Sequence, residues 1–191
     1  RAANKCLEEK RSSNVVTIFE PNWNGKTTFL TCFKQRNNKL AIGGANCDLK
    51  VFDVNTGQSV FTAKSTNTDW PSIKHNIRLS GVDWVVNEHE DPHLVATCSR
   101  SDSCVKIYDI KERQKKAVMS IDLKKLNNAN NESNSPSMTT LCTLPSVNST
   151  ASPSQSIVVG TTQGRMLALD LRLMSKATKV LGGFKGFLGG S

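Results

Sequence analysis

The stretch Leu94–Asp109, LVATCSRSDSCVKIYD, decides the fold. Its first apolar run, Leu94–Cys98, alternates with a period of two, which is typical of a β-strand. Its second run, Val105–Tyr108, is rich in β-branched and aromatic residues and ends at Asp109, where a turn is expected. A short polar segment of serines and an aspartate separates the two runs. The stretch therefore predicts a β-hairpin.

The same hairpin pattern occurs three times. Aligned on the last aspartate, the copies are Leu40–Asp53 (LAIGGANCDLKVFD), Val95–Asp109 (VATCSRSDSCVKIYD) and Ile157–Asp170 (IVVGTTQGRMLALD). The aspartates are about 56 and about 61 residues apart, a spacing that indicates repeated structural units. Further strand candidates precede the copies at Thr28–Phe33, Gly81–Val86 and Thr139–Leu144, and follow them at Ser59–Ala63, Ala117–Ile121 and Thr178–Phe184. Four short antiparallel strands per unit are typical of a β-propeller blade.

We therefore predict an all-β protein with about three propeller blades, at residues 27–63, 77–123 and 138–184. Two Asn- and Ser-rich segments, 124–137 and 145–156, are expected to be flexible insertions, because they hold too little apolar surface to offset their ordering entropy. A seven-bladed ring at about 40–45 residues per blade needs roughly 300 residues, whereas this chain has 191. An open wedge of three blades would expose strand edges, so we expect a larger, seven-bladed ring with missing blades.

The middle copy resembles the WD-repeat family, whose units run D-x-[ST]-[VI]-[RK]-[VI]-[WFY]-D. Its segment Asp102–Asp109, DSCVKIYD, follows that pattern with Cys104 at the [ST] position. The first copy has Asn46 in place of the turn aspartate, and the third copy has Gln163 there. The Gly-His pair that is usual upstream is missing from all three copies.

Three longer stretches narrow the resemblance to one branch of this family: Asp48–Trp70, Ile157–Arg172 and Lys179–Ser191. They are similar to the nucleolar ribosome-assembly factors that comprise the animal WD-repeat-containing protein seventy-four and the fungal Nop-seven-associated protein. The resemblance implies a non-catalytic scaffold in the nucleus and nucleolus that docks on precursors of the large (60S) ribosomal subunit. Its implied partners are other ribosome-assembly proteins, the ribosomal RNA backbone and an AAA-type ATPase. The alternative is a generic WD-repeat adaptor of chromatin or ubiquitin-ligase type, unrelated to ribosomes.

Composition excludes several other classes of function. The formal net charge of +9 and the pI near 9.4 favour an anionic partner. Six cysteines without a C-x-x-C pair suit a reducing compartment. No apolar run approaches the roughly 18 residues of a membrane span, so no membrane partner is expected. The sequence offers no nucleophile–base pair, paired carboxylates or cofactor fingerprint, and we predict no enzyme activity, cofactor, metal or small-molecule substrate.

Basic residues form the candidate site. In a four-stranded blade the first-to-second and third-to-fourth connections emerge on the same face, where they could contact a phosphate backbone or an acidic protein. No aromatic residue accompanies these connections, so RNA contact would be blind to base sequence. The alternative is that Lys and Arg simply favour solvated turns. Ten cations belong to this class: Lys34, Arg36, Lys39, Lys111, Arg113, Lys115, Lys116, Arg172, Lys176 and Lys179.

Trp70 lies in the long segment between the first two predicted blades. Tryptophan is over-represented at the energetic centres of protein interfaces, so Trp70 is a candidate partner anchor. The alternative is that it packs over the sheet as a lid, which is the commoner use of a large aromatic side chain.

Overall fold

The computed structural model describes residues 22–23, 26–27, 29–64, 77–85, 91–101, 103–123, 137–144, 156–171 and 180–181. All elements with bounds in these ranges are β-strands. The prediction of an all-β protein is confirmed. Nearly all of the two predicted insertions, 124–137 and 145–156, lies outside the described residues.

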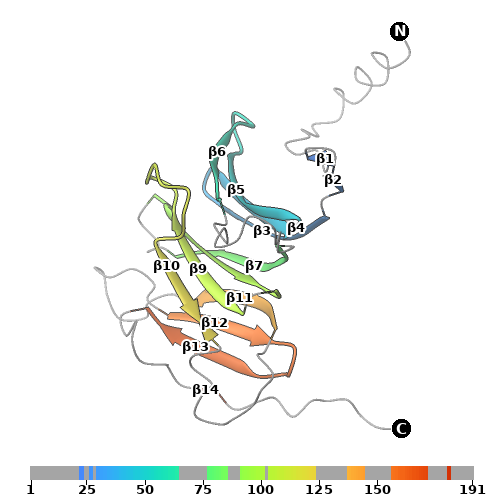
Figure 1. Cartoon of the computed structure of the whole chain (residues 1–191). Helices are drawn as coiled ribbons and strands as arrows, with labels where there is room; N and C mark the ends of the chain where they lie inside the picture. The colour runs from blue at the N-terminus through green and yellow to red at the C-terminus, as the bar shows by residue number, and fades with distance from the viewer. Residues whose placement is uncertain are drawn as a thin grey trace.

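Three four-stranded antiparallel sheets contain twelve of the strands, and in each sheet consecutive strands are neighbours (Figure 1). The first sheet holds β3 (Phe29–Arg36), β4 (Lys39–Ala45), β5 (Cys47–Asp53) and β6 (Ser59–Thr62). The second holds β7 (Leu79–Trp84), β8 (Leu94–Ser99), β9 (Cys104–Asp109) and β10 (Met119–Asp122). The third holds β11 (Met138–Leu144), β12 (Ser156–Thr161), β13 (Met166–Asp170) and β14 (Val180–Leu181). A short separate ribbon pairs β1 (Asn22–Trp23) with β2 (Lys26–Thr27).

The repeated hairpin is the centre of each sheet. In the second sheet β8 pairs with β9 from Leu94 opposite Asp109 to Cys98 opposite Val105. In the first sheet Asn46, which replaces the turn aspartate of the pattern, has a φ of 58°. Asparagine adopts this left-handed conformation more readily than most residues, so the replacement suits the turn between β4 and β5.

The second sheet is covered on both faces. One face packs against the first sheet, where Val51 and Phe61 meet Trp84, Val95 and Tyr108 in one buried cluster. Each side chain of this size contributes about 1.5–3 kcal/mol when it is fully buried. Burial on both faces explains why the neighbours Val95 and Ala96, which point to opposite faces of β8, are both fully buried.

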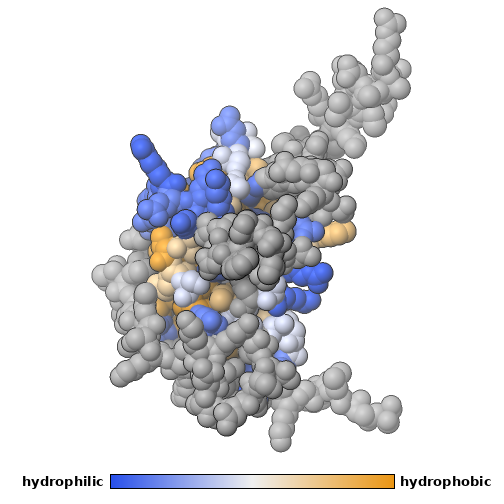
Figure 2. Space-filling view, in the orientation of Figure 1, coloured by the Kyte–Doolittle hydropathy of each residue, from blue (hydrophilic) through white to orange (hydrophobic). Residues whose placement is uncertain are grey.

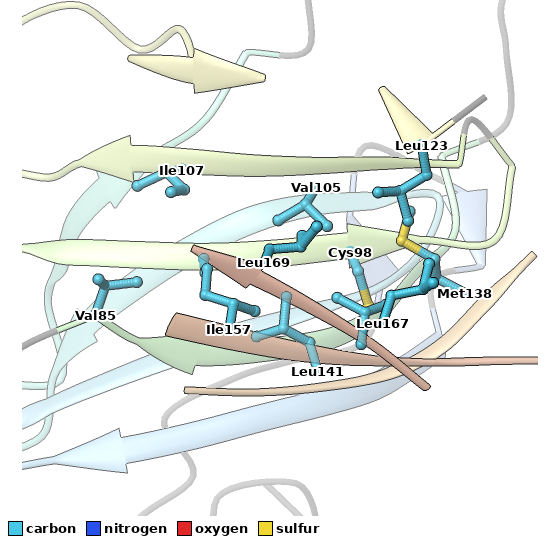
Figure 3. Packing of buried hydrophobic residues seen from close by; sticks show 12 residues of the cluster. Val85, Cys98, Val105, Ile107, Leu123, Met138, Leu141, Ile157, Leu167 and Leu169 are labelled. Atoms are coloured by element: carbon cyan, nitrogen blue, oxygen red, sulfur yellow. The ribbon is translucent and has the colours of Figure 1, made fainter. Parts of the chain in front are cut away.

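The other face of the second sheet packs against the third sheet. Figure 3 shows Leu141, Ile157 and Leu169 of the third sheet pointing towards Val105 and Ile107 of the second. The first strands of the two sheets come especially close at Gly81 on β7. A Cβ atom at Gly81 would lie 2.8 Å from the Leu141 nitrogen and 2.9 Å from the Cys98 sulfur. The approach of β7 to β11 therefore requires glycine at this position.

All three sheets carry a β-bulge at the same place, near the start of the pairing between the first and second strands. The register shifts between Leu30 and Cys32, between Leu79 and Gly81, and between Met138 and Thr140. The residue inside each shift bears a hydroxyl group: Thr31, Ser80 and Thr139.

These bulge hydroxyls join one sheet to the next. The Thr31 hydroxyl donates a hydrogen bond to the Leu79 carbonyl of the second sheet. The Ser80 hydroxyl donates to the Met138 carbonyl of the third sheet, with a distance of 2.7 Å between the oxygens. Both acceptors stand immediately before the bulge residue of the next sheet. The two joints between sheets are therefore built in the same way.

Candidate functional site

The connection between β9 and β10 carries the most concentrated positive charge among the described residues. We call residues 110–118 the cationic connection. Lys111, Arg113, Lys115 and Lys116 are all exposed there, and Glu112 is its only acidic residue. Figure 2 shows hydrophilic side chains gathered over this connection and over the tip between β5 and β6. The prediction of exposed cations at this place agrees with the structure, whereas their binding role stays a prediction.

Hydrogen bonds fix the backbone of the cationic connection. The Ile110 nitrogen donates to the His93 carbonyl at 2.9 Å, and the Lys64 nitrogen donates to the Lys115 carbonyl at 2.8 Å. The Lys111 nitrogen donates to Oδ1 of Asp109, also at 2.9 Å. The charges are therefore presented on a backbone that is tied to both the first and the second sheet.

The aspartate that closes the first and second copies of the pattern shapes the turn that follows it. Oδ1 of Asp53 accepts hydrogen bonds from the backbone nitrogens of Asn55 and Thr56, at 2.9 and 3.0 Å. Its Oδ2 accepts one from the Asn38 side chain at 2.9 Å. These bonds, that of Thr56 foremost, lower the pKa of Asp53 below its usual 3.8. Oδ1 of Asp109 likewise accepts a hydrogen bond from the Lys111 nitrogen, so the repeated aspartate has a structural role in both sheets.

The prediction of a basic loop over residues 34–39 is wrong. Lys34 and Arg36 belong to β3, and Lys39 begins β4, so only Asn37 and Asn38 form the turn. Most side chains of β3 are exposed, on both faces of the strand. A strand that buries so few residues tolerates polar side chains. The composition of residues 34–39 therefore resembles that of a loop.

Lys39 is engaged in an ion pair between the first two sheets. Its Nζ lies 2.8 Å from both carboxylate oxygens of Asp91 and 3.0 Å from the Pro92 carbonyl oxygen. The bond from Lys39 lowers the pKa of Asp91, and the nearby Lys111 charge acts in the same direction. Because the Lys39 side chain is only 14% exposed and its ammonium already has three acceptors, it contributes little to a surface for partners.

A polar junction at the first strands of the three sheets was not anticipated from the sequence. Asp83 on β7 is buried, with 5% of its surface exposed. Its Oδ2 accepts hydrogen bonds from the Thr143 nitrogen at 2.8 Å and the Thr143 hydroxyl at 3.1 Å, and its Oδ1 lies 3.6 Å from Nζ of Lys34. The adjacent Trp84 donates from Nε1 to the Lys34 carbonyl at 3.1 Å. Lys34 therefore serves partly to hold the sheets together.

A sequence signal for this junction did exist. Asp83 interrupts the apolar segment Gly81–Val86, and an aspartate in a buried strand is seldom tolerated without a partner. The signal indicates a buried polar interaction but does not identify the partners, which lie 49 and 60 residues away in the sequence.

The remaining predicted site residues, Trp70, Arg172, Lys176 and Lys179, lie outside the described residues. Within the described ranges, no group of three or more His, Cys, Asp or Glu side chains is arranged to hold a metal ion. Burial raises the pKa of the Cys32 thiol to about 11 and also raises that of Cys47, so neither thiol is activated. The described residues form no helix that is long and apolar enough to cross a membrane.

Comparisons with known proteins identify the fold alone. No protein-family model matches the chain, and no curated protein matches it. The computationally designed protein Ika8 is similar in structure, with a TM-score of 0.54 and 17% identity over 85% of this chain and 39% of that one. The designed protein Ika4 has a TM-score of 0.52 and 18% identity, over 85% of this chain and 78% of that one. The chain thus spans well under half the length of Ika8.

Proposed function

We propose that this chain forms consecutive blades of a WD-repeat β-propeller and acts as a non-catalytic scaffold in assembly of the large ribosomal subunit. The cationic connection is the observation that carries the docking role. It offers four exposed cations within six residues, on a backbone fixed by hydrogen bonds. The ribosomal setting, the nucleolar location and the AAA-type ATPase partner rest on the resemblance of Asp48–Trp70, Ile157–Arg172 and Lys179–Ser191 to nucleolar assembly factors.

The two joints between sheets, in which a bulge hydroxyl bonds to a carbonyl of the next sheet, support the propeller part of the proposal. Each sheet has four consecutive antiparallel strands, and the first strands β3, β7 and β11 are neighbours. A radial arrangement of sheets around a common axis brings first strands together in this way.

A larger ring is supported by the exposed apolar side chains of β3, the first strand of the first sheet. Phe29 and Phe33 on β3 are 62% and 72% exposed, and Leu30 beside them is 46% exposed. Large apolar side chains grouped on one strand are unusual on a free surface and indicate a covering element. A preceding blade would cover those on the face away from the second sheet in a propeller.

Thr139 provides a test of the larger ring. It occupies the bulge position that Thr31 and Ser80 use to bond the next sheet. In the intact protein, Thr139→Val should lower the free energy of unfolding by about 1 kcal/mol, because a further blade would lose its joint hydrogen bond. Urea denaturation measures the change. The exposed neighbour Thr140 gives a matched control, since Thr140→Val should change stability by less than about 0.5 kcal/mol. Equal effects of the two substitutions would contradict a further blade on the third sheet.

The docking role predicts a strong effect of charge reversal on the cationic connection. Changing Lys111, Arg113, Lys115 and Lys116 to glutamate should weaken association with large-subunit precursors at least about tenfold at about 0.15 M salt, and the wild-type affinity should fall steeply as salt rises. Sedimentation of the tagged protein with precursor particles measures this. The reversals take the formal net charge from +9 to about +1. Changing the exposed pair Arg78 and Arg100 to glutamate takes it to about +5, and shows whether loss of positive charge away from the connection weakens binding.

Mass spectrometry of proteins that copurify with the intact protein decides between the two scaffold classes. Assembly factors and ribosomal proteins of the large subunit should dominate, and the fourfold charge reversal should deplete them. Enrichment of chromatin or ubiquitin-ligase subunits in their place would show that the protein is an adaptor of the generic WD-repeat kind.

A further inference from the structure

An open pocket lies at the rim between the first and second sheets. It measures about 230 Å³ and is lined by the whole of β6, Ser59–Thr62, and by residues of the cationic connection, namely Ile110, Glu112, Arg113 and Lys115. Its inner side is apolar, because Phe61 and Ile110 are buried there and the Phe61 ring packs edge-on against Tyr108, with ring centroids 6.1 Å apart. We call this feature the rim pocket.

The wall formed by β6 is the outer edge of the first sheet. Among the described residues, β6 pairs as a strand only with β5. An edge strand presents backbone N–H and C=O groups that can pair with another extended chain. Its four residues, at about 3.3 Å each, span roughly 13 Å, enough to pair with about four residues of a peptide. Val60 on this strand is 50% exposed and offers an apolar contact.

The opposite wall is positively charged. Arg113 and Lys115 line the pocket, and Lys111 and Lys116 belong to the same exposed connection, against the single acid Glu112. This wall is held in place by the bond from the Lys64 nitrogen to the Lys115 carbonyl and by that from the Val118 nitrogen to the Ile107 carbonyl, both 2.8 Å. A wall that is already ordered loses little entropy when a ligand binds.

We propose that the rim pocket binds an extended acidic segment of a partner protein, which adds to β6 as a strand and places its carboxylates against Arg113 and Lys115. Side chains of a strand alternate between two faces. The segment therefore alternates Asp or Glu with small apolar residues, and the apolar residues contact the exposed side chain of Val60. This site does not depend on the ribosomal setting of the proposed function.

Nucleic acid fits the rim pocket less well than a peptide. A phosphodiester backbone can meet the cations, but it lacks the regular donors and acceptors that pair with the edge of a strand. Phe61, the aromatic residue in the pocket wall, is 6% exposed and cannot stack on a base.

A labelled peptide of eight residues that alternates glutamate and valine tests the strand addition. We expect it to bind the intact protein, and we expect N-methylation of every second peptide nitrogen to weaken binding at least about tenfold, because strand pairing needs these N–H groups. Fluorescence anisotropy measures both affinities. A peptide with lysine in place of glutamate should not bind detectably, because its charges repel those of the pocket.

Two double variants test the position of the site. Changing Arg113 and Lys115 to glutamate should weaken peptide binding at least about tenfold. Arg78 and Arg100 are exposed at the other end of the second sheet, and the same change there should alter affinity less than about twofold. Circular dichroism of both variants checks that the fold is kept.

Three results would overturn the proposal. These are equal binding of the N-methylated and unmodified peptides, equal effects of the two double variants, and tighter binding of an oligouridine of eight nucleotides that displaces the peptide. None of these results bears on copurification with ribosomal precursors, so the rim pocket and the proposed function fail independently.

Discussion

Replacement of Trp84 by alanine is expected to lower the free energy of unfolding by about 4 kcal/mol. Trp84 is 1% exposed and packs with Val51, Phe61 and Tyr108 between the first two sheets. Truncation would remove a large buried area and leave a cavity that the surrounding strands can close only in part. It would also leave the Lys34 carbonyl without the indole N–H, which lies 3.1 Å away. Equilibrium urea unfolding measures the loss.

Two further variants make the Trp84 result specific. Trp84→Phe keeps an aromatic side chain but has no N–H donor, so its cost should be clearly smaller than that of Trp84→Ala. Val118→Ala truncates an apolar side chain that is 47% exposed and should change stability by less than about 0.5 kcal/mol. A Trp84→Ala loss as small as that of Val118→Ala would show that the first two sheets do not depend on this contact.

Replacement of Asp83 by alanine is expected to lower the free energy of unfolding by about 3 kcal/mol. The partly buried N–H of Thr143 would lose its acceptor, and the hydroxyl of Thr143 would keep only the Trp84 carbonyl at 2.9 Å. A buried polar group without its partner costs about 1–3 kcal/mol. The ion pair with Lys34 adds less, because Nζ is 3.6 Å away and the Lys34 side chain is 52% exposed and can return to water.

The contributions of Lys34 and Thr143, two of the partners of Asp83, can be separated. Lys34→Met should cost less than about 1 kcal/mol, whereas Asp83→Asn, which can accept but not as a carboxylate, should fall between the wild type and Asp83→Ala. A double-mutant cycle between Asp83→Ala and Thr143→Val measures the coupling with the Thr143 hydroxyl directly. If Lys34→Met costs as much as Asp83→Ala, the ion pair and not the bond to the Thr143 backbone holds the junction.

The strands were predictable because their determinants are local. The segment Leu94–Asp109 carries its period, its β-branched residues and its turn within one short stretch, and the closing aspartate bonds to nitrogens two and three residues ahead in the first copy. The exposed cations of the β9–β10 connection were predictable for the same reason, since a tight polar segment between two strands has nowhere to bury its charges.

The contacts between sheets were not predictable because they join residues far apart in the sequence. Lys39 and Asp91 are 52 residues apart, and Asp83 and Thr143 are 60 apart. Such pairs depend on how one sheet is placed on the next, and no spacing in the chain encodes that placement. The rim pocket was also not predictable, because its walls come from two different sheets. The prediction of a loop over residues 34–39 failed for another reason. An exposed strand can have the same polar composition as a turn, so composition did not distinguish the two.

The shared hydroxyl at the bulge of each sheet makes the units modular. Because Thr31 and Ser80 each bond to the carbonyl just before the next bulge, the second sheet ends one joint and begins another with the same chemistry. A gene duplication or deletion of one whole unit would therefore bring together two surfaces that already match. A fold of this kind can change its number of units without new joints having to evolve.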